Sequence, residues 1–509
     1  MINRKGLQTR IRIALRYWIL SCIILTGLEA ADKEVSDSPE SKIDPQVLAR
    51  TKGGLPLQVT ILCSTQLLEM PHGFGEFCEA NANANRLELR SQVIKELKAI
   101  AANGEQKAII KALPSRTNPV QHWIVNAVSA RINQKQAKAI AAMEEVKYIY
   151  NGFPPLPGQR KRRLSEVIPY TEESSSSKMK GAIPWNLKAI GADQVWKRKN
   201  VAGENVVVAM LEGGIDYTHK DLRNNIWINR FEKPDNGKDD DNNGWIDDYY
   251  GFNFRTGNGE VIPQTERHHH GTMTSGIVVG DGSGGIITGV APRAKVMLLS
   301  GHAVYAYQYA LEQGADILSM SFSVPKLGNS RGLWRLMSEH AVCAGMVLIS
   351  GCGNFQQSEK IPVQIRVPEG IPCVIGAGGL DKALEVPRFC SLGPVEWGSV
   401  KFYSDYALPE GLTKPDICAF PGPGYPQLSP EDGQYIQNRR GNSFSSPHIA
   451  GVAALMLSTT PELPAWRVKE IMEATAIDVG DPGKDNRTGA GLVNALKAVT
   501  VAEEFSALP

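Results

Sequence analysis

Three short segments of the chain place an acid, a base and a nucleophile in that order. Glu212 directly follows the apolar run 206–211, and His270 precedes a stretch of small residues. Ser443 lies on a glycine-led turn that opens an apolar helix. A serine hydroxyl is a weak nucleophile near neutral pH, so it needs an imidazole within hydrogen-bond reach to take its proton. A carboxylate behind the imidazole fixes the tautomer of the ring and stabilises the imidazolium. These residue types indicate nucleophilic acyl transfer.

The elements that must position these residues alternate between strands and helices from residue 183 onward. Helical stretches lie at 304–313 and 330–344, and short β-rich runs lie at 205–211, 295–299, 317–322, 346–350 and 373–377. Such alternation predicts an α/β fold with a doubly wound, mostly parallel sheet flanked by helices. In that fold the active residues stand at the carboxyl ends of the strands.

A smaller α+β unit precedes the large one. Its predicted helices lie at 87–113 and 134–143, and its predicted strands at 55–62, 123–128 and 146–150. The segment 151–182 that follows contains clustered prolines and serines, so we expect a linker. Its basic run 160–163 has two interpretations that the sequence leaves open, a solvated segment or a processing site.

The N-terminus has the layout of a secretory signal peptide. Basic residues precede the apolar run 18–25, and the small residues Ala30 and Ala31 follow it. We therefore expect a signal peptide over 1–31, a secreted or periplasmic protein, and no stable membrane span after its removal. An uncleaved N-terminal anchor is the alternative. The remaining expected boundaries are 32–150 for the small unit, folded from about 55, 183–502 for the large domain, and 503–509 for a tail.

Composition and cysteine usage narrow the class of protein. Lys and Arg number 55 against 53 Asp and Glu, which gives a net charge of +2, and 42% of the residues are hydrophobic. These values argue against a nucleic-acid binder driven by bulk charge and against wholesale disorder. Without Cys22 of the signal peptide seven cysteines remain, an odd number with no CxxC spacing, so a zinc site is not expected. Either a Cys63–Cys78 disulfide or buried free thiols fit this pattern.

The segment around Ser443 resembles the nucleophile motif of the subtilisin-like serine peptidases, or subtilases. It reads Gly441-Asn-Ser-Phe-Ser-Ser-Pro-His-Ile-Ala-Gly451, and it departs from the family pattern only at Asn442, where the family has Thr. The resemblance runs from about Trp185 to Ala498. Further matching segments are Gly289-Val-Ala-Pro292, Gly314-Ala-Asp316, Ser319-Met-Ser321, Gly353-Asn354, Lys414-Pro-Asp416 and Gly489-Ala-Gly-Leu-Val-Asn494.

The resemblance implies a serine endopeptidase that acts on polypeptide substrates through an acyl-enzyme and needs no cofactor for catalysis. It assigns the nucleophile to Ser443, the base to His270, and oxyanion stabilisation to Asn354 together with the backbone N–H of Ser443. Glu212 stands at the position of the residue that orients the base. The substrate-binding walls fall on Ser321, Phe322, Ser323 and Gly353.

Four departures from the family pattern bear on activity. Glu212 replaces an Asp and is longer by one methylene group. The segment 300–304 is shorter than the family segment that pairs with the substrate backbone. Ser323 adds a side chain where the backbone must approach closely, and the amide of Asn442 replaces a threonine hydroxyl near the oxyanion site. The alternative to an enzyme is therefore a weakened or inactive subtilase-fold protein that binds peptide or a protein partner.

An acidic loop resembles calcium loops of the EF-hand type. Oxygen side chains alternate around Gly244, and the expected ligands of a structural calcium ion are Asp239, Asp241, Asn243 and Asp247. Tyr250 stands where the final bidentate Glu is expected, so a solvated acidic loop is the alternative.

The unit at 55–150 resembles the inhibitory prodomain of subtilases, most visibly at 125–130 and 143–149. That resemblance implies an intramolecular inhibitor whose tail enters the active site. We expect cleavage after the basic run 160–163, or elsewhere within 151–182.

Overall fold

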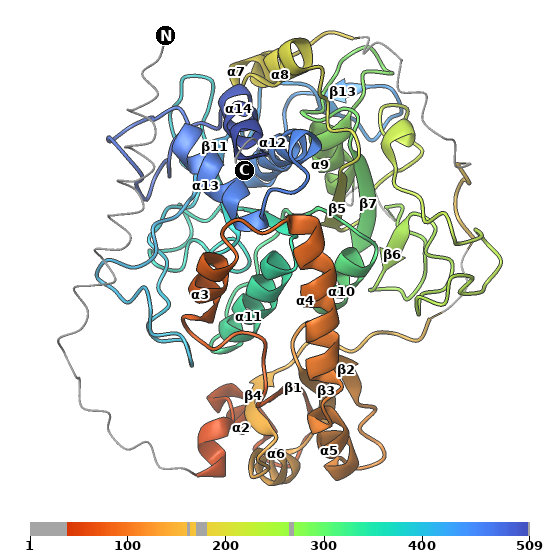
Figure 1. Cartoon of the computed structure of the whole chain (residues 1–509), viewed down its shortest axis with the longest axis vertical. Helices are drawn as coiled ribbons and strands as arrows, with labels where there is room; N and C mark the ends of the chain where they lie inside the picture. The colour runs from red at the N-terminus through yellow and green to blue at the C-terminus, as the bar shows by residue number, and fades with distance from the viewer. Residues whose placement is uncertain (1–37, 160–162, 169–180, 264–268, 507–509) are drawn as a thin grey trace.

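The computed structural model describes residues 38–159, 163–168, 181–263 and 269–506 (Figure 1). The expected signal peptide, most of the basic run, the serine run 174–177 and the last three residues of the tail lie outside the described residues. The chain forms a large α/β unit and a smaller N-terminal unit, which carries β1–β4 at the lower end of Figure 1. Among the described residues, no helix is both long and apolar enough to span a membrane.

The large unit is built on a seven-stranded sheet with the strand order β11-β10-β9-β8-β5-β7-β6. Every pair of neighbouring strands is parallel. The predicted doubly wound α/β fold is therefore confirmed. The strands are β5 (Val207–Glu212), β6 (Gly251–Asn253), β7 (Lys295–Ser300), β8 (Ile317–Met320), β9 (Val347–Gly351), β10 (Ile375–Gly379) and β11 (Ile417–Ala419).

Helices flank this sheet, and α12 (Ser445–Thr459) is buried along almost its whole length. It packs against α9 (His270–Val279), α14 (Ala495–Ser506) and the central strands. The helices α10 (Ala303–Glu312) and α11 (Ser330–Cys343) contact each other; α10 also contacts β5, and α11 contacts β9. The other elements are α7 (Trp185–Ala189), α8 (Ala192–Lys199), η2 (Arg223–Asn225), β12 (Gln427–Leu428), β13 (Tyr435–Ile436), η4 (Asn442–Phe444) and α13 (Ala465–Thr475).

The N-terminal unit is a four-stranded antiparallel sheet of order β2-β3-β1-β4 with helices packed against it. The α+β expectation for this region agrees with the structure. Its strands are β1 (Leu57–Cys63), β2 (Val120–His122), β3 (Ala127–Ile132) and β4 (Val146–Asn151). Its helices are η1 (Pro39–Lys42), α2 (Pro45–Thr51), α3 (Gly73–Ala80), α4 (Arg86–Ala101), α5 (Glu105–Ala112) and α6 (Gln134–Ala141).

One predicted strand of this unit is wrong. Residues 123–126 form a turn between β2 and β3, although their apolar side chains had predicted a strand over 123–128. The turn is buried because it packs against the large unit, where the N–H groups of Trp123 and Ile124 donate to Gln308 Oε1 of α10 at 3.0 and 3.4 Å. An apolar run that is buried by docking has the same composition as a buried strand.

Arg86 fixes the N-terminal unit to the large unit. It begins α4, which lies beside α11 (Figure 1), and only 2% of its surface is exposed. Its guanidinium donates to Asp316 Oδ1 at 2.8 Å, to Pro461 O at 2.8 Å and to Gly345 O at 3.2 Å. A buried arginine with all these partners makes the two units one continuous packed structure.

The described part of the linker follows the surface of the acidic loop region. The N–H of Phe153 donates to Thr60 Oγ1 at 3.1 Å, and Gln159 then bonds with both its amide atoms to the backbone of Gly244 and Ile246 at 2.6 and 2.9 Å. Beyond the basic run, the N–H of Leu164 donates to Asp235 Oδ1 at 2.7 Å. The chain is thus held on both sides of residues 160–162.

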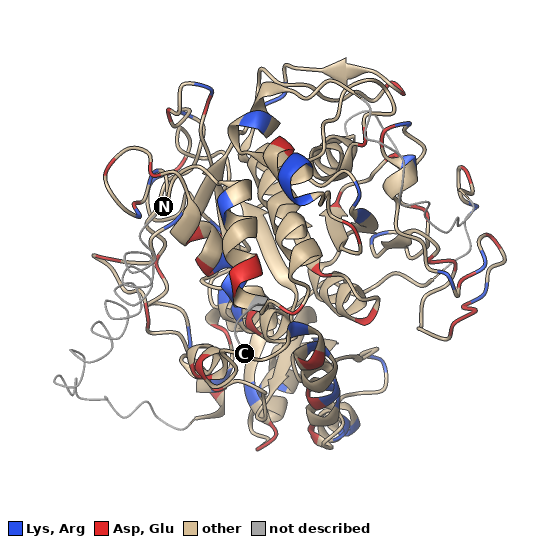
Figure 2. Ribbon diagram, turned by 45° about the horizontal axis from the view of Figure 1, so that its top comes forward, with Lys and Arg blue, Asp and Glu red and all other residues tan. Residues whose placement is uncertain are grey.

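The charged side chains are mixed in sign, and the described cysteines are free thiols, one of the two states that the sequence left open. Acidic and basic side chains are interspersed over both units in Figure 2. All seven described cysteines are free thiols, so Cys63 and Cys78 are not joined. Six of the seven are buried, and burial raises the pKa of Cys390 to about 12.

Candidate active site

Glu212 and His270 meet at the carboxyl end of the sheet. Glu212 is the last residue of β5 and only 8% of its surface is exposed, while His270 is the first residue of α9. His270 Nδ1 lies 2.9 Å from Glu212 Oε2, a hydrogen bond of normal length. The extra methylene group of the glutamate is therefore accommodated, and the carboxylate reaches the imidazole.

The second oxygen of the carboxylate is held by Thr274, a residue that the sequence reasoning missed. Thr274 Oγ1 donates to Glu212 Oε1 at 3.0 Å and also contacts Gly271 O at 3.1 Å. Thr274 lies four residues after His270 on α9, so both side chains project from the same helix face. The spacing of four residues between His270 and Thr274 was the sequence feature that could have identified Thr274. The hydroxyl fixes the direction in which the carboxylate faces the ring.

The charge of Glu212 also sets the protonation of His270. Burial of the ring disfavours the imidazolium, but the negative charge of Glu212 and its hydrogen bond outweigh that effect, so the pKa of His270 is raised. A raised pKa makes the ring a better proton acceptor when a neighbouring hydroxyl loses its proton.

Ser443 stands in η4, immediately before α12, and its hydroxyl is turned toward β8. Its Oγ donates to Ser321 O at 3.4 Å, and Ser321 Oγ in turn donates to Ser443 O at 3.0 Å. The ring centroids of His270 and Phe444 are 5.7 Å apart, so His270 and the segment that contains Ser443 are neighbours. Across residues 38–159, 163–168, 181–263 and 269–506, no hydrogen bond joins Ser443 and His270.

Asn354 and the backbone of Ser443 provide two donors beside the nucleophile. Asn354 Oδ1 accepts from the N–H of Asn442 at 2.8 Å, which orients the amide so that its NH₂ group faces away from that bond. The side-chain nitrogen of Asn354 would lie 3.1 Å from a Cβ placed on Gly441, where φ is +150°. Within the described parts of the chain, no acceptor takes the N–H of Ser443. Both donors are free to stabilise an oxyanion.

Asn442 does not replace the threonine hydroxyl at this site. Its side chain is fully buried and its Nδ2 donates to Gly353 O at 2.7 Å. Its Oδ1 accepts from Cys390 Sγ at 3.2 Å. Both ends of the amide are therefore used to tie together neighbouring loops.

The residues expected to line the substrate follow β8 and β9. Ser321, Phe322 and Ser323 come directly after β8, and Gly353 stands two residues after β9. Ser323 Oγ donates to Glu369 Oε1 at 2.6 Å, so its side chain is turned away from the strand axis toward a buried carboxyl. Burial raises the pKa of Glu369 to about 7.

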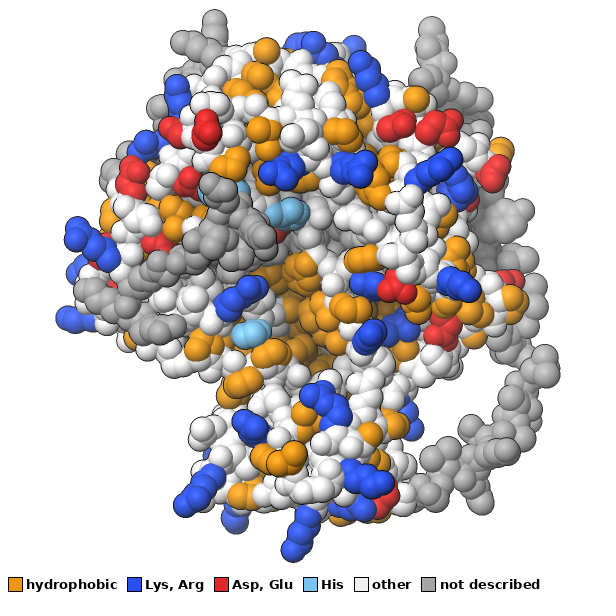
Figure 3. Space-filling model, turned by 180° about the vertical axis from the view of Figure 1, so that it is seen from behind, with side chains coloured by type: hydrophobic (Ala, Val, Ile, Leu, Met, Phe, Trp, Pro, Cys, Tyr) orange, Lys and Arg blue, Asp and Glu red, His pale blue; other side chains and the backbone are white. Residues whose placement is uncertain are grey.

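A largely apolar hollow of about 460 Å³ lies beside Glu212 at the junction of the two units. In Figure 3, apolar side chains gather in a recess at this junction. Its lining includes Glu212, His302 and Phe322 from the large unit and residues 151–154, which are the last residue of β4 and the start of the linker. The connection between β7 and α10 consists of residues 301–302, and both line this hollow.

The acidic loop brings together part of the expected calcium ligand set. Carboxylate oxygens of Asp239, Asp241 and Glu232 lie within 4.8 Å of one another, and sequence reasoning missed Glu232. Asp247 is not in this group, because its carboxylate accepts the N–H groups of residues 236 and 237. Asn243 Nδ2 donates to Asp241 Oδ2 at 3.1 Å, so the asparagine borders the group.

Comparison with known proteins identifies the family. The family model described as "Subtilase family" matches residues 203–491. Subtilisin-like protease 1 of Plasmodium vivax is 27% identical over 354 residues, which are 64% of this chain and 52% of that protein. The major intracellular serine protease of Bacillus subtilis is 27% identical over a region that covers 58% of this chain and 81% of that protein. Subtilisin DY of Bacillus licheniformis is 27% identical over a region that covers 61% of this chain and 97% of that protein. The chain spans about half the length of the Plasmodium relatives. Its sequence and its fold place it in the subtilase family.

Proposed function

We propose that this protein is an exported subtilisin-like serine endopeptidase in which a glutamate performs the role of the orienting acid. The observation that carries the proposal is the hydrogen bond of 2.9 Å between His270 Nδ1 and Glu212 Oε2, with Thr274 holding the second oxygen. This bond leaves Nε2 of His270 as the proton acceptor. The longer acid thus performs the orienting role.

The reaction begins when the hydroxyl of Ser443 turns from Ser321 O toward His270. Ser443 Oγ attacks the carbonyl carbon of the scissile peptide bond and its proton moves to His270 Nε2. Negative charge on the carbonyl oxygen receives hydrogen bonds from Asn354 Nδ2 and the N–H of Ser443. The C–N bond then breaks, the amine takes the proton from Nε2, and water hydrolyses the acyl-enzyme through the same imidazole.

A second candidate function is peptide binding without cleavage. It is favoured by one observation, the hydrogen bond of Ser443 Oγ to Ser321 O, which directs the nucleophile away from the base. In this case the hollow beside Glu212 and Phe322 holds a peptide or partner segment that the protein does not cut.

Labelling with a fluorophosphonate probe separates the two functions. The wild type should be labelled, Ser443→Ala should not, and Ser458→Ala, a matched control on the helix α12 that follows Ser443, should be labelled like the wild type. Absence of labelling in folded wild type would refute the endopeptidase and leave the binding protein.

We further propose that the N-terminal unit is an inhibitory prodomain, with the boundaries expected above, and that the chain is cut within 151–182. The proposal is supported by the hollow beside Glu212, which residues 151–154 line together with the large unit. N-terminal sequencing of the mature protein should find a start within or directly after this linker. A mature protein that begins at Ala31 or Asp32 would refute cleavage in the linker.

We propose that Glu232, Asp239 and Asp241 hold a structural calcium ion. The donor set fits, because all three residues offer carboxylate oxygens, and Glu232 Oε1 is buried without a hydrogen-bond partner. A bound cation would compensate the charge of that oxygen and stabilise the loop 232–248. Catalysis would not require it.

A further inference from the structure

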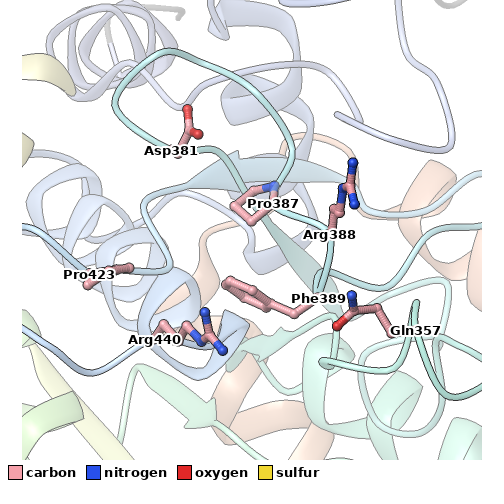
Figure 4. A pocket seen from close by; sticks show the side chains of 8 residues that line it. Gln357, Asp381, Pro387, Arg388, Phe389, Pro423 and Arg440 are labelled. Atoms are coloured by element: carbon pink, nitrogen blue, oxygen red, sulfur yellow. The ribbon is translucent and has the colours of Figure 1, made fainter.

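A second hollow, of about 430 Å³, lies beside the nucleophile segment (Figure 4). It is open to solvent and more polar than the hollow beside Glu212. Its lining consists of Gln357, Asp381, Pro387, Arg388, Phe389, Gly422, Pro423 and Arg440. None of these residues belongs to the site described above.

The walls of this hollow are fixed to the catalytic framework by Asn442. Arg440 precedes Ser443 by three residues, so one wall continues into the nucleophile turn. Cys390, which follows Phe389, donates its S–H to Asn442 Oδ1 at 3.2 Å, and Asn442 Nδ2 binds Gly353 O at 2.7 Å. The N–H of Gly441 donates to Pro421 O at 2.8 Å and holds the third wall. The departure at Asn442 therefore positions this hollow relative to Ser443.

The two hollows serve different parts of a bound peptide. They share no lining residue, and the first lies with Phe322 and Glu212, on the side where the acyl part of the substrate is expected. A peptide that presents its carbonyl to Ser443 must extend in both directions from that point. The hollow at Arg440 then receives residues on the amine side of the scissile bond. This assignment rests on the proposed function.

The charge of the hollow indicates what it binds. The Arg440 guanidinium carbon lies 5.8 Å from the ring centroid of Phe389, whereas the side chain of Arg388 lies at the other end of the hollow and points away from this ring (Figure 4). Neither arginine forms an ion pair with an acidic side chain of the described residues. Asp381, the acidic residue of the lining, accepts the N–H groups of residues 383 and 385 through Oδ1 and so fixes its own turn.

We propose that this hollow binds a carboxylate on the leaving-group side of the scissile bond. The carboxylate comes from an Asp or Glu side chain or from the C-terminus of the substrate. Guanidinium groups match carboxylates in geometry and charge, and the ring of Phe389 gives the bound residue an apolar surface beside Arg440. Arg388 and Arg440 are then specificity-determining residues for the proposed peptidase.

The experiment digests a proteome-derived peptide library and reads the cut positions by mass spectrometry, in parallel with free and with amidated C-termini. Wild type should cut about five- to twentyfold more often where Asp or Glu occupies one of the first two leaving-side positions, or where a free C-terminus lies there. The double variant Arg388→Gln/Arg440→Gln should lose this preference. Arg439→Gln, an exposed neighbour that does not line the hollow, should keep it.

The two libraries distinguish the sources of the carboxylate. A preference that survives amidation identifies an acidic side chain, and one that disappears identifies the C-terminus. Equal cutting of acidic and neutral sites by wild type, or a preference that the double variant retains, would overturn the proposal.

A binding measurement separates this proposal from the proposed function. Ser443→Ala cannot cut, so the tripeptide amides Ala-Asp-Glu and Ala-Asn-Gln and the free acid of Ala-Asn-Gln are titrated into it by calorimetry. At least one of the two peptides that carry a carboxylate should bind at least fivefold more tightly than the neutral amide, and the difference should vanish when both arginines are replaced. Equal affinity of all three peptides would refute the carboxylate site even if the wild type is an active peptidase.

Discussion

Replacing Glu212 by Asp tests whether the longer acid is required by this fold. The aspartate side chain is shorter by one C–C bond, about 1.5 Å. On an unchanged backbone the carboxylate would retreat from 2.9 Å to about 4.4 Å from His270 Nδ1, beyond hydrogen-bond range, and it would also leave Thr274. A hydrogen bond to a charged group contributes about 1.5–3 kcal/mol, so the labelling rate should fall about 10- to 150-fold. The substitution that restores the residue of the family should thus reduce activity.

The assay is the rate of fluorophosphonate labelling across pH, with Glu212→Gln as the charge control. Because the imidazole must be neutral to accept a proton, the wild-type rate should rise with pH through the raised pKa of His270, above 6.5. Glu212→Gln removes the charge that raises the pKa and leaves burial, so the midpoint should move to lower pH while the plateau falls. NMR titration of the His270 ring checks the same shift without catalysis. Faster labelling of Glu212→Asp than of wild type would refute the reasoning.

Three other changes test the calcium site, the docking of the N-terminal unit and the buried ion pairs. Calcium after EGTA treatment should raise the melting temperature of wild type but not of Glu232→Gln in scanning fluorimetry, and equal shifts in both would remove Glu232 from the site. Arg86→Ala should cost about 3 kcal/mol of unfolding free energy in urea denaturation, because it removes the short ion pair of the buried Asp316 and leaves that carboxylate with Arg90 at 3.8 Å. Asp416→Asn should cost a similar amount because it leaves the fully buried ammonium of Lys414 unpaired. A variant that is as stable as the wild type would show that its buried ion pair does not contribute to the free energy of unfolding.

The sequence was most informative where local pattern and fold agree. Strands β5, β7 and β9 appeared as short apolar runs, and Glu212 and His270 stand at a strand end and a helix start, as predicted. The motif around Ser443 predicted a turn that opens a buried helix, and η4 and α12 have that form because a glycine-led turn and an apolar helix occupy consecutive residues. Such features depend only on neighbours along the chain.

Contacts between distant segments were not predictable from the sequence. Arg86 and Asp316 are 230 residues apart and form an ion pair only because α4 docks beside α11. The direction of the Asn442 amide depends on Cys390 and Gly353, which belong to other loops. Glu232 joins Asp239 and Asp241 because the loop folds back on itself, and no spacing rule for calcium ligands includes it.

The linker is attached to the large unit on both sides of residues 160–162, and this determines whether the two fragments separate after cleavage of the chain at these residues. Gln159 is held by Gly244 and Ile246, and Leu164 by Asp235, so each new chain end keeps its own anchor. The severed halves would remain at a high effective concentration, because Arg86 also keeps the two units packed together. A nicked molecule would therefore elute as one particle in gel filtration and separate into two chains only in denaturant. Scission alone would leave residues 151–154 lining the hollow beside Glu212, and their departure would be set by the rate at which the N-terminal unit dissociates.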